Sequence, residues 1–406
     1  MTAPSLGWRT PLVILICGCL IALVGFGPRS TLGLFLTPMS AANGWGRDVF
    51  ALALALQMLL WGMAQPFVGA IADRFGAVRV MWLGAVLYAA GLAWMAFATS
   101  QGALILSAGF LIGFGLAGTS FTVVIGAFGK LLPPHWRSLS FGVGTAASSF
   151  GQFLFSPLAV GLNQSLDWRY TLLLFACVVL AIIPLALALA LPRNAVSKET
   201  SAPQSVMQAL REALRHRSYV LLILGYFTCG FQVFFITVHL PAYLVDRGLS
   251  VDLGAWTIGL IGLFNIIGSI TAGYLGDKVP KRFILASIYF LRSLAILVFI
   301  LIPPSPLTSM IFGATIGLLW LSTIPPTQAL VAVMFGTRWL TMLAGLAFFS
   351  HQVGGFLGVW LGGLLYERSG SYDVIWYLTI LLGFLAAAVN LPIVEKPVDR
   401  PVAAAA

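Results

Sequence analysis

The chain is a succession of apolar runs of about 20 residues or more, separated by short segments that hold nearly all of its charged side chains. A helix needs about 20 mostly apolar residues to cross a bilayer, where its backbone polar groups must bond within the helix itself. With 60% hydrophobic and 8% charged residues, the chain has too few polar groups to cover a water-facing surface. The sequence therefore predicts an all-α membrane protein and excludes the soluble, disordered, collagenous and disulfide-rich classes.

Twelve runs are long enough to be transmembrane helices: residues 11–36, 49–70, 78–98, 103–129, 138–162, 170–191, 219–243, 254–275, 283–302, 307–333, 340–365 and 374–394. The longest polar stretch separates six spans from six and is expected to form a linker or interfacial helix. The predicted domains are an N-terminal half over 1–192, a cytoplasmic linker over 193–217, a C-terminal half over 218–396 and a tail over 397–406. The first run is not expected to be a cleaved signal peptide, because it has one basic flanking residue, Arg9, and no small-residue cleavage site.

The distribution of Lys and Arg predicts the orientation. With the N-terminus inside, the cytoplasmic segments hold 16 of the 22 Lys and Arg residues and the outer segments hold 4. Such an excess satisfies the positive-inside rule, so we expect a multi-pass protein of the cell (inner) membrane with both termini in the cytoplasm. The net charge of +10 is therefore an anchoring asymmetry and not a single basic patch, which excludes nucleic acid as a partner.

An internal repeat relates the two halves of the chain. GAIADRFGAVR begins at Gly69 and GYLGDKVPKR begins at Gly273, an offset of 204 residues. The same offset, within one residue, relates five further pairs: Gly27 and Gly230, Pro38 and Pro241, Thr119 and Thr323, Gly142 and Gly345, and Gly151 and Gly354. Two such halves are expected to share a cavity near mid-membrane and to open it to each side in turn by rocking against one another.

The loop between the second and third spans resembles the cytoplasmic signature of the major facilitator superfamily. The matching residues are, in the two copies, Gly69, Asp73, Arg74, Gly76 and Arg79, then Gly273, Asp277 and Lys278. The second copy is weaker, because Pro280 stands where its second glycine is expected. An Asp at a helix end with adjacent cations can pair with a neighbouring helix end, so these residues are predicted to close the cytoplasmic side. The alternative is that the charges only anchor a turn.

All 12 acidic residues fall in loops, span ends or tails, whereas two arginines lie inside spans, Arg29 in the first and Arg292 in the ninth. A charged side chain at the centre of a membrane helix costs at least about 2.5 kcal/mol, so such residues are paired or functional. Because no intramembrane carboxylate is available, the natural counter-ion is the substrate. The sequence therefore predicts an anionic substrate.

Arg29 is the first candidate binding residue. It lies in GFGPRSTLGLF, where Gly27-Pro28 is expected to break the helix and free backbone groups for binding. Its partner in the repeat is Gln232, which is also polar. An arginine suits a carboxylate, because its planar fork donates two parallel hydrogen bonds. The alternative is a side chain that extends to the outer interface.

Three segments also resemble the monocarboxylate porters and the related oxalate:formate exchangers of the superfamily: Gly7-Trp8, Pro28-Arg29-Ser30, and HWRSLSFGVGTAASSFG at the fifth span. In those families a first-helix cation and an eighth-helix arginine handle the carboxylate and the proton. The eighth span here, LFNIIGSITAGYLGD, keeps Asn265 but has Ser269 at the position of that arginine.

Arg292 is predicted to compensate for that loss if its guanidinium reaches past Asn265 toward Ser269. The alternative is a structural arginine that bonds carbonyl groups or Tyr289. His351, in FFSHQVGGFLG, stands where the oxalate:formate type of exchanger carries a cation, and histidine titrates between about pH 5 and 8. His351 and Arg292 are therefore the candidates for proton coupling, although a neutral histidine that bonds across helices is an equal alternative for His351.

The remaining candidate substrate ligands are neutral polar residues inside spans, Thr119, Ser148 and Gln152. Most intramembrane hydroxyl groups bond only to their own helix, so each is a weaker candidate. The four cysteines lie in apolar runs without metal-ligand spacing and are expected to be small buried hydrophobic residues: Cys17, Cys19, Cys177 and Cys229.

These observations predict a secondary active transporter of a small organic anion, most simply a monocarboxylate, driven by proton symport or anion exchange. The alternative is a proton-coupled exporter of drugs or metabolites, but Gly109 replaces the arginine of such exporters and no buried acid is present. The chain lacks HExxH, GxSxG and clustered His or Cys, so neither an enzyme nor a cofactor is expected. A channel needs a selectivity ring, usually built by oligomers, whereas two six-helix halves favour a monomeric carrier.

Overall fold

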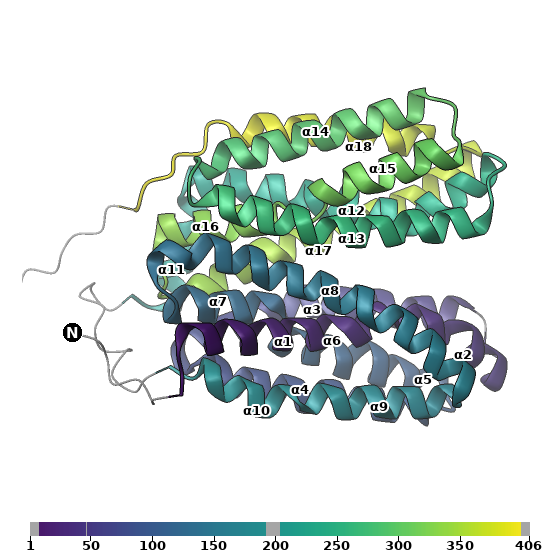
Figure 1. The fold of residues 1–406 in the computed structure, drawn as a ribbon, viewed down its shortest axis with the longest axis horizontal. Helices are drawn as coiled ribbons and strands as arrows, with labels where there is room; N and C mark the ends of the chain where they lie inside the picture. Colours follow the sequence, from purple (N-terminus) through teal and green to yellow (C-terminus); the bar gives the residue numbers. More distant parts are fainter. Residues whose placement is uncertain (1–7, 46, 192–203, 399–406) are drawn as a thin grey trace, which may run out of the picture.

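The computed structural model describes residues 8–45, 47–191 and 204–398, and all regular secondary structure in these ranges is helical. Figure 1 shows two helical bundles side by side, one formed by the first half of the chain and the other by the second half. This arrangement confirms the predicted all-α fold. It also agrees with the prediction that the chain folds as two halves of similar size.

The N-terminal bundle contains α1 (Pro11–Ser30), η1 (Leu32–Phe35), α2 (Leu36–Asn43), α3 (Arg47–Phe75), α4 (Ala77–Ala96), α5 (Gln101–Leu104), the π-helical segment η2 (Ile105–Leu111), α6 (Ile112–Thr119), α7 (Phe121–Leu131), η3 (Pro134–Trp136), α8 (Arg137–Ser165), α9 (Trp168–Leu180), α10 (Ile182–Ala186) and η4 (Leu187–Leu189). The C-terminal part contains α11 (Val206–Arg215), α12 (Arg217–Asp246), α13 (Val251–Gly276), α14 (Lys281–Leu301), α15 (Pro306–Leu319), α16 (Ile324–Phe335), α17 (Leu340–Ser369) and α18 (Asp373–Asn390).

Eleven helical segments of the described ranges are long and apolar enough to cross a membrane. The twelfth predicted span, at residues 138–162, is formed by α8, a helix of 29 residues in which Ser, Thr and Gln interrupt the apolar residues. Because α8 packs along α1 and α13 inside the bundle, its polar groups face other helices. The structure therefore supplies all twelve helices that the apolar runs predicted.

One end of the molecule gathers the start of α1, the turn between α13 and α14, helix α11 and the end of α18 (Figure 1, left). We call it the linker end, because α11 lies within the predicted linker at residues 193–217. Ser205 and Gln208 cap the N-terminus of α11, each side chain accepting the backbone N–H of the other. The linker residues 192–203 and the tail residues 399–406 lie outside the described ranges.

The prediction that Gly27-Pro28 breaks the first span is wrong, because α1 continues through both residues to Ser30. Hydroxyl groups close this helix end. The Oγ of Ser30 donates to the carbonyl of Gly27 at 2.6 Å, and the Oγ1 of Thr31 donates to the carbonyl of Pro28 at 2.8 Å. A proline this close to the end of a helix removes few backbone bonds, so the helix tolerates it.

The interruptions lie instead in spans four and ten, which the sequence predicted as continuous. Span four changes direction at Ser120, which is extended (ψ 153°) between α6 and α7, and its Oγ accepts the N–H of Val123. Span ten is interrupted between Leu319 and Ile324, just before Pro325-Pro326. The two interruptions are related by the repeat, and helix breaks of this kind are typical of substrate sites in transporters.

Repeat-related glycines allow close crossings of helices. A Cβ at Gly151 would lie 2.3 Å from the carbonyl oxygen of Leu23, and one at Gly354 would lie 2.0 Å from that of Phe227, so α1–α8 and α12–α17 cross in the same way. Between the halves, a Cβ at Gly142 would lie 2.6 Å from the carbonyl oxygen of Ser269, where α8 crosses α13. Each of these crossings therefore requires a residue without a side chain.

Candidate transport site

Arg29 lies in the last turn of α1, with its guanidinium over two aromatic rings. Its Cζ is 5.6 Å from the ring centroid of Phe26 and 5.5 Å from that of Trp61 on α3. The side chain is part-buried, and no acidic group of the described residues lies within ion-pair distance of it. Aromatic faces stabilise a cation without neutralising its charge, so the guanidinium retains its hydrogen-bonding capacity for an anion.

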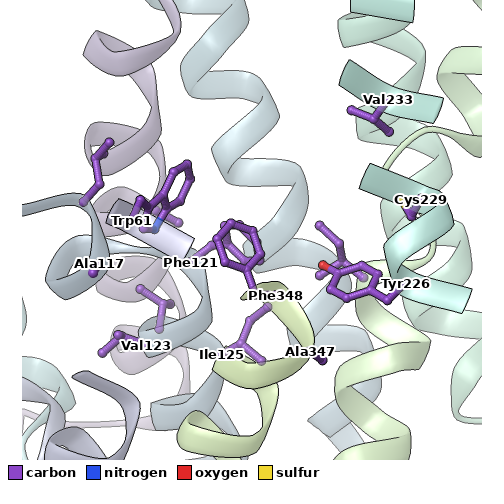
Figure 2. Close-up of a cluster of buried hydrophobic side chains, with 14 of the residues drawn as sticks. Trp61, Ala117, Phe121, Val123, Ile125, Tyr226, Cys229, Val233, Ala347 and Phe348 are labelled. Carbon is purple, nitrogen blue, oxygen red and sulfur yellow. The ribbon is translucent and has the colours of Figure 1, made fainter. Parts of the chain in front are cut away.

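An aromatic layer joins the two halves beside Arg29. Phe348 on α17 packs against Trp61 at a centroid distance of 5.0 Å and against Phe121 on α7 at 5.6 Å. Figure 2 shows Phe121 and Phe348 between Trp61 on one side and Tyr226 on the other. Trp61, Phe121 and Phe348 are at most 8% exposed. The sequence analysis missed this layer, because aromatic residues inside apolar runs carry no signal of their own.

Arg292 on α14 is fully buried. Its guanidinium bonds to backbone groups where span ten is interrupted. Its Nη2 donates to the carbonyl groups of Leu319 and Trp320, which α15 leaves free at its C-terminus. Its Nη1 donates to the Oε1 of Gln232 at 3.2 Å. The guanidinium is thus directed at span ten and α12 and not at Ser269. A cation at a helix C-terminus satisfies free carbonyl groups and interacts favourably with the helix dipole.

Gln232 and Asn265 connect span ten to the neighbouring helices from two sides. The Nε2 of Gln232 donates to the carbonyl of Thr379 on α18 at 3.1 Å. The Nδ2 of Asn265 donates to the Oγ of Ser149 on α8 at 2.6 Å, and its Oδ1 accepts from the backbone N–H of Leu321 at 3.0 Å. The Oγ of Ser269 also donates to this Oδ1, at 3.2 Å. In both amides the oxygen and the NH2 group therefore have partners in this conformation.

His351 on α17 lies beside the aromatic layer, stacked on Phe348 at a centroid distance of 5.7 Å. Its Nδ1 is 3.4 Å from the Oε1 of Gln352, whereas its Nε2 has no hydrogen-bond partner although the residue is only 4% exposed. The neighbouring thiol of Cys229 is fully buried on α12. Of the cysteines that were expected to be buried, Cys17 and Cys19 are part-buried and Cys177 is exposed, so that prediction is wrong for three of the four.

The hydroxyl groups of two of the weaker candidates bond within their own helices. The hydroxyls of Thr119 and Ser148 donate to the carbonyls of Gly115 and Gly144, one turn earlier in their own helices. Gln152 is part-buried on α8. Thr119 and Ser148 therefore have the intrahelical bonds that are usual for hydroxyl groups inside membrane helices.

The signature aspartates lie at contacts between the halves at the linker end. The Oδ2 of Asp73 accepts the N–H of Met342 near the start of α17 at 2.8 Å, and its Oδ1 pairs with Lys130 on α7 at 2.6 Å. In the second copy the Oδ2 of Asp277 accepts the N–H of Leu139 near the start of α8 at 3.1 Å. Each Asp thus accepts a backbone bond from the opposite half, at positions related by the repeat. Lys130 is a member of this contact that the sequence analysis did not single out.

The other signature residues shape the same end. Gly76 has φ +92°, a conformation that favours glycine, and it directly precedes α4. Pro280 has φ −54° before α14, so the second copy makes a different turn. Arg74 lies over the ring of Phe75 and Lys278 over that of Tyr274. Arg79 is exposed, and Gly69 and Gly273 contact Thr341 and Gly142 of the opposite half.

Comparison with known proteins agrees with this architecture. The Major Facilitator Superfamily profile matches residues 14–359. The chain is 28% identical to an uncharacterized MFS-type transporter, YcxA, of Bacillus subtilis (strain 168), over 97% of each chain. It is 27% identical to Monocarboxylate transporter 11 of Homo sapiens, over 82% of this chain and 71% of that protein.

Among solved structures, the E. coli fucose:proton symporter FucP matches with a TM-score of 0.71 at 17% identity, over 94% of this chain and 99% of that one. At this identity the likeness concerns the fold alone. Members of the family are transporters, which agrees with the prediction that the chain is not an enzyme. From its profile, its relatives and its two repeated bundles, this chain belongs to the major facilitator superfamily, as a multi-pass membrane transporter.

Proposed function

We propose that this transporter carries a small organic anion, most simply a monocarboxylate, by proton symport or anion exchange. The observation that carries the proposal is Arg29, a part-buried cation inside a span with aromatic rings beside it and no acid within ion-pair distance among the described residues. An unneutralised cation inside a membrane span is costly, and a counter-ion that binds to it offsets this cost. The relatives named monocarboxylate transporters give the same substrate class.

In this proposal Arg29 binds the carboxylate, and the apolar body of the substrate packs against Trp61 and Phe348. A bidentate contact with the guanidinium fixes the orientation of the carboxylate, whereas the rings accept any flat or short aliphatic body. Arg292 acts as a positioning residue, since it holds the interruption of span ten through Leu319 and Trp320. Gln232, Asn265 and Ser269 become available to the substrate only when span ten moves.

Alternating access follows from the contacts of Asp73 and Asp277 at the linker end. These bonds join the two halves, so breaking them is required before that end can open. With the orientation that the Lys and Arg distribution predicts, the linker end faces the cytoplasm, and the described conformation is closed on that side. The proposed carrier works as a monomer, because each half supplies one of the two bundles that rock.

The proposal is tested by measuring the thermal stability of the purified protein with a panel of mono- and dicarboxylates, and with neutral and cationic ligands of similar size. We expect carboxylates to raise Tm in the wild type and to have no effect on Arg29→Gln. Arg169→Gln is the matched control, since Arg169 lies in the first turn of α9 with a 43% exposed side chain that pairs with Asp167, and it is expected to respond like the wild type.

Uptake into proteoliposomes completes the test. Saturable uptake with counterflow of an unlabelled carboxylate identifies a carrier and not a channel. If neutral or cationic ligands stabilise the wild type and Arg29→Gln equally, and carboxylates have no effect, the anion assignment is wrong. The exporter alternative is then favoured.

A further inference from the structure

A buried polar cluster adjoins the aromatic layer on the side of the C-terminal half. At its centre the Sγ of Cys229 is 3.2 Å from the Oγ1 of Thr323 and 3.5 Å from the Nη1 of Arg292. The imidazole of His351 lies on another side of the same sulfur. Cys229, Arg292 and Thr323 are fully buried, and His351 is 4% exposed. Three helices, α12, α14 and α17, thus bring an acid, a permanent cation and a titratable base together, and Thr323 adjoins them from the residue that precedes α16.

The group that can neutralise the charge of Arg292 by losing a proton is the thiol of Cys229. No carboxylate of the described residues lies within ion-pair distance of the guanidinium, whose other partners, Gln232 and two carbonyl groups, are neutral. The other titratable groups that face the cluster are the phenols of Tyr226 and Tyr289. A phenol is ordinarily a weaker acid than a thiol, with pKa values of about 10 and 8.5. Cys229 is therefore the strongest acid in contact with the guanidinium.

His351 supplies a second, independent observation. Apart from the thiol of Cys229, with which the imidazole interacts, its Nε2 has no hydrogen-bond partner, although the side chain is more than nine-tenths buried. Leaving a buried polar nitrogen without a partner is unfavourable. A ring nitrogen without another partner beside a thiol can accept a proton. Pairs of Cys and His next to a cation are known to hold a thiolate and to exchange a proton between sulfur and nitrogen.

We propose that Cys229 and His351 form the proton-binding pair of this transporter, beside the fixed charge of Arg292. Without the added proton, the thiolate neutralises Arg292 and the imidazole is neutral. When a proton binds, it forms either the S–H bond of Cys229 or the Nε2–H bond of His351, and the cluster gains one positive charge. No other bond forms or breaks, and the proton comes from water on the open side.

This change of charge couples the proton to the substrate, a step that rests on the proposed transport of an anion. An added positive charge in a medium of low dielectric constant strengthens the binding of a carboxylate nearby. Phe348 links the two sites, since it stacks on His351 and packs against Trp61, whose ring lies under Arg29. Proton binding therefore strengthens anion binding, and anion binding strengthens proton binding by the same factor.

The first experiment needs no substrate. A variant with Cys17, Cys19 and Cys177 replaced by Ala keeps Cys229 as its only thiol, and the absorbance of thiolate at 240 nm is followed from pH 5 to 9 against a cysteine-free variant. We expect a thiolate signal at pH 7 that decreases on acidification, with a midpoint that shifts when His351→Gln removes the second proton acceptor. The matched control keeps Cys17, which is part-buried on α1, and is expected to give no signal at pH 7. The proposal is overturned if Cys229 gives none up to pH 9.

The second experiment measures the number of protons that enter proteoliposomes with each labelled pyruvate, using a trapped pH dye. Ser at position 229 keeps a hydroxyl for Thr323 and Arg292 but does not ionise, so Cys229→Ser is expected to lower the proton-to-pyruvate ratio at least tenfold. Cys17→Ser is expected to leave it unchanged. A wild-type ratio in Cys229→Ser contradicts the proposal. If the wild type carries no carboxylate at all, the proposed function fails, and the thiolate titration still decides on the proton site.

Discussion

The contact between Asp73 and Met342 is predicted to hold the linker end closed. Its carboxylate pairs with Lys130 of the same half and accepts hydrogen bonds from the backbone N–H of Met342 and the hydroxyl of Thr341 in the opposite half. The bond to Lys130 is available in both conformations, whereas the bonds to the opposite half are available only in the closed one. Asp73→Ala removes all of them, yet only the loss of the bonds to the opposite half changes the balance between the conformations.

The expected change in the open population follows from the strength of the hydrogen bond between Asp73 and Met342. A hydrogen bond to a charged group contributes about 1.5–3 kcal/mol. Since 1.4 kcal/mol is a factor of ten in an equilibrium constant, Asp73→Ala is expected to raise the population open at the linker end about 10- to 150-fold. Asp73→Asn keeps a neutral acceptor and is expected to lie between wild type and Asp73→Ala, because neutral bonds are about half as strong.

Accessibility of Thr341 provides the assay. This residue is 2% exposed, with Gly69 and Gly126 packed against it from the opposite half. In a variant otherwise free of cysteine, Thr341→Cys is alkylated by a maleimide only when the linker end opens, and because every variant compared lacks the Thr341 hydroxyl, the ratio of rates reports the bond between Asp73 and Met342. The alkylation rate is expected to rise with Asp73→Ala by the factor given above. Asp277→Ala is the matched variant, and its effect is expected to be smaller, because Asp277 is exposed and its bond to Leu139 is longer, at 3.1 Å. Equal alkylation rates in wild type and a folded Asp73→Ala would refute the reasoning.

Three further predictions concern stability, each measured as Tm of the purified protein. Gly142→Ala places a Cβ against the carbonyl oxygen of Ser269 and is expected to destabilise the protein by about 1–3 kcal/mol through overpacking. Gly161→Ala is the control, because a Cβ there meets nothing within 4 Å. Equal Tm values for the two variants would contradict the close crossing of α8 and α13. Arg292→Gln leaves two buried carbonyl groups of span ten without donors, at about 1–3 kcal/mol each, so it is expected to lower Tm more than Arg29→Gln does; the reverse order would argue against a positioning role. Asn265→Ala removes three hydrogen bonds that link α8, α13 and span ten, at about 1 kcal/mol each, and a Tm within error of wild type would count against that network.

The fold was predictable because its signals are long and redundant. Each span repeats the same apolar signal over about 20 residues, and the offset that relates Gly69 to Gly273 extends over the whole chain. Even the crossings of α1 with α8 and of α12 with α17 use glycines that the repeat had already paired. Local signals were weaker. Pro28 predicted a helix break that the structure does not have, because hydroxyl groups bond the carbonyls at that helix end. The helix does break at Ser120, where the residue is neither proline nor glycine.

The site was less predictable, because its groups come together only through packing. Arg29 and Arg292 stand out in an apolar sequence, and the absence of charges around them could be read directly. The bond between Asp73 and Met342 joins residues 269 positions apart, and no local pattern indicates which N–H the carboxylate accepts. Cys229 resembles any small apolar residue of its span until Arg292, Thr323 and His351 surround it. Thr323 could be indicated as a site residue only through the repeat, which pairs it with another polar residue, Thr119.

Each of the two signature aspartates accepts from a main-chain N–H of the opposite half, at Leu139 and Met342. A backbone N–H is supplied by every residue except proline, so the sequence at these two positions is free to drift while the contact survives. The aspartates have no such freedom. A saturation mutagenesis of this surface is thus expected to be lopsided, with Asp73 intolerant and Met342 accepting most replacements of similar size but not proline. Such one-sided recognition explains how a short motif in one half can persist while the surface that it meets diverges.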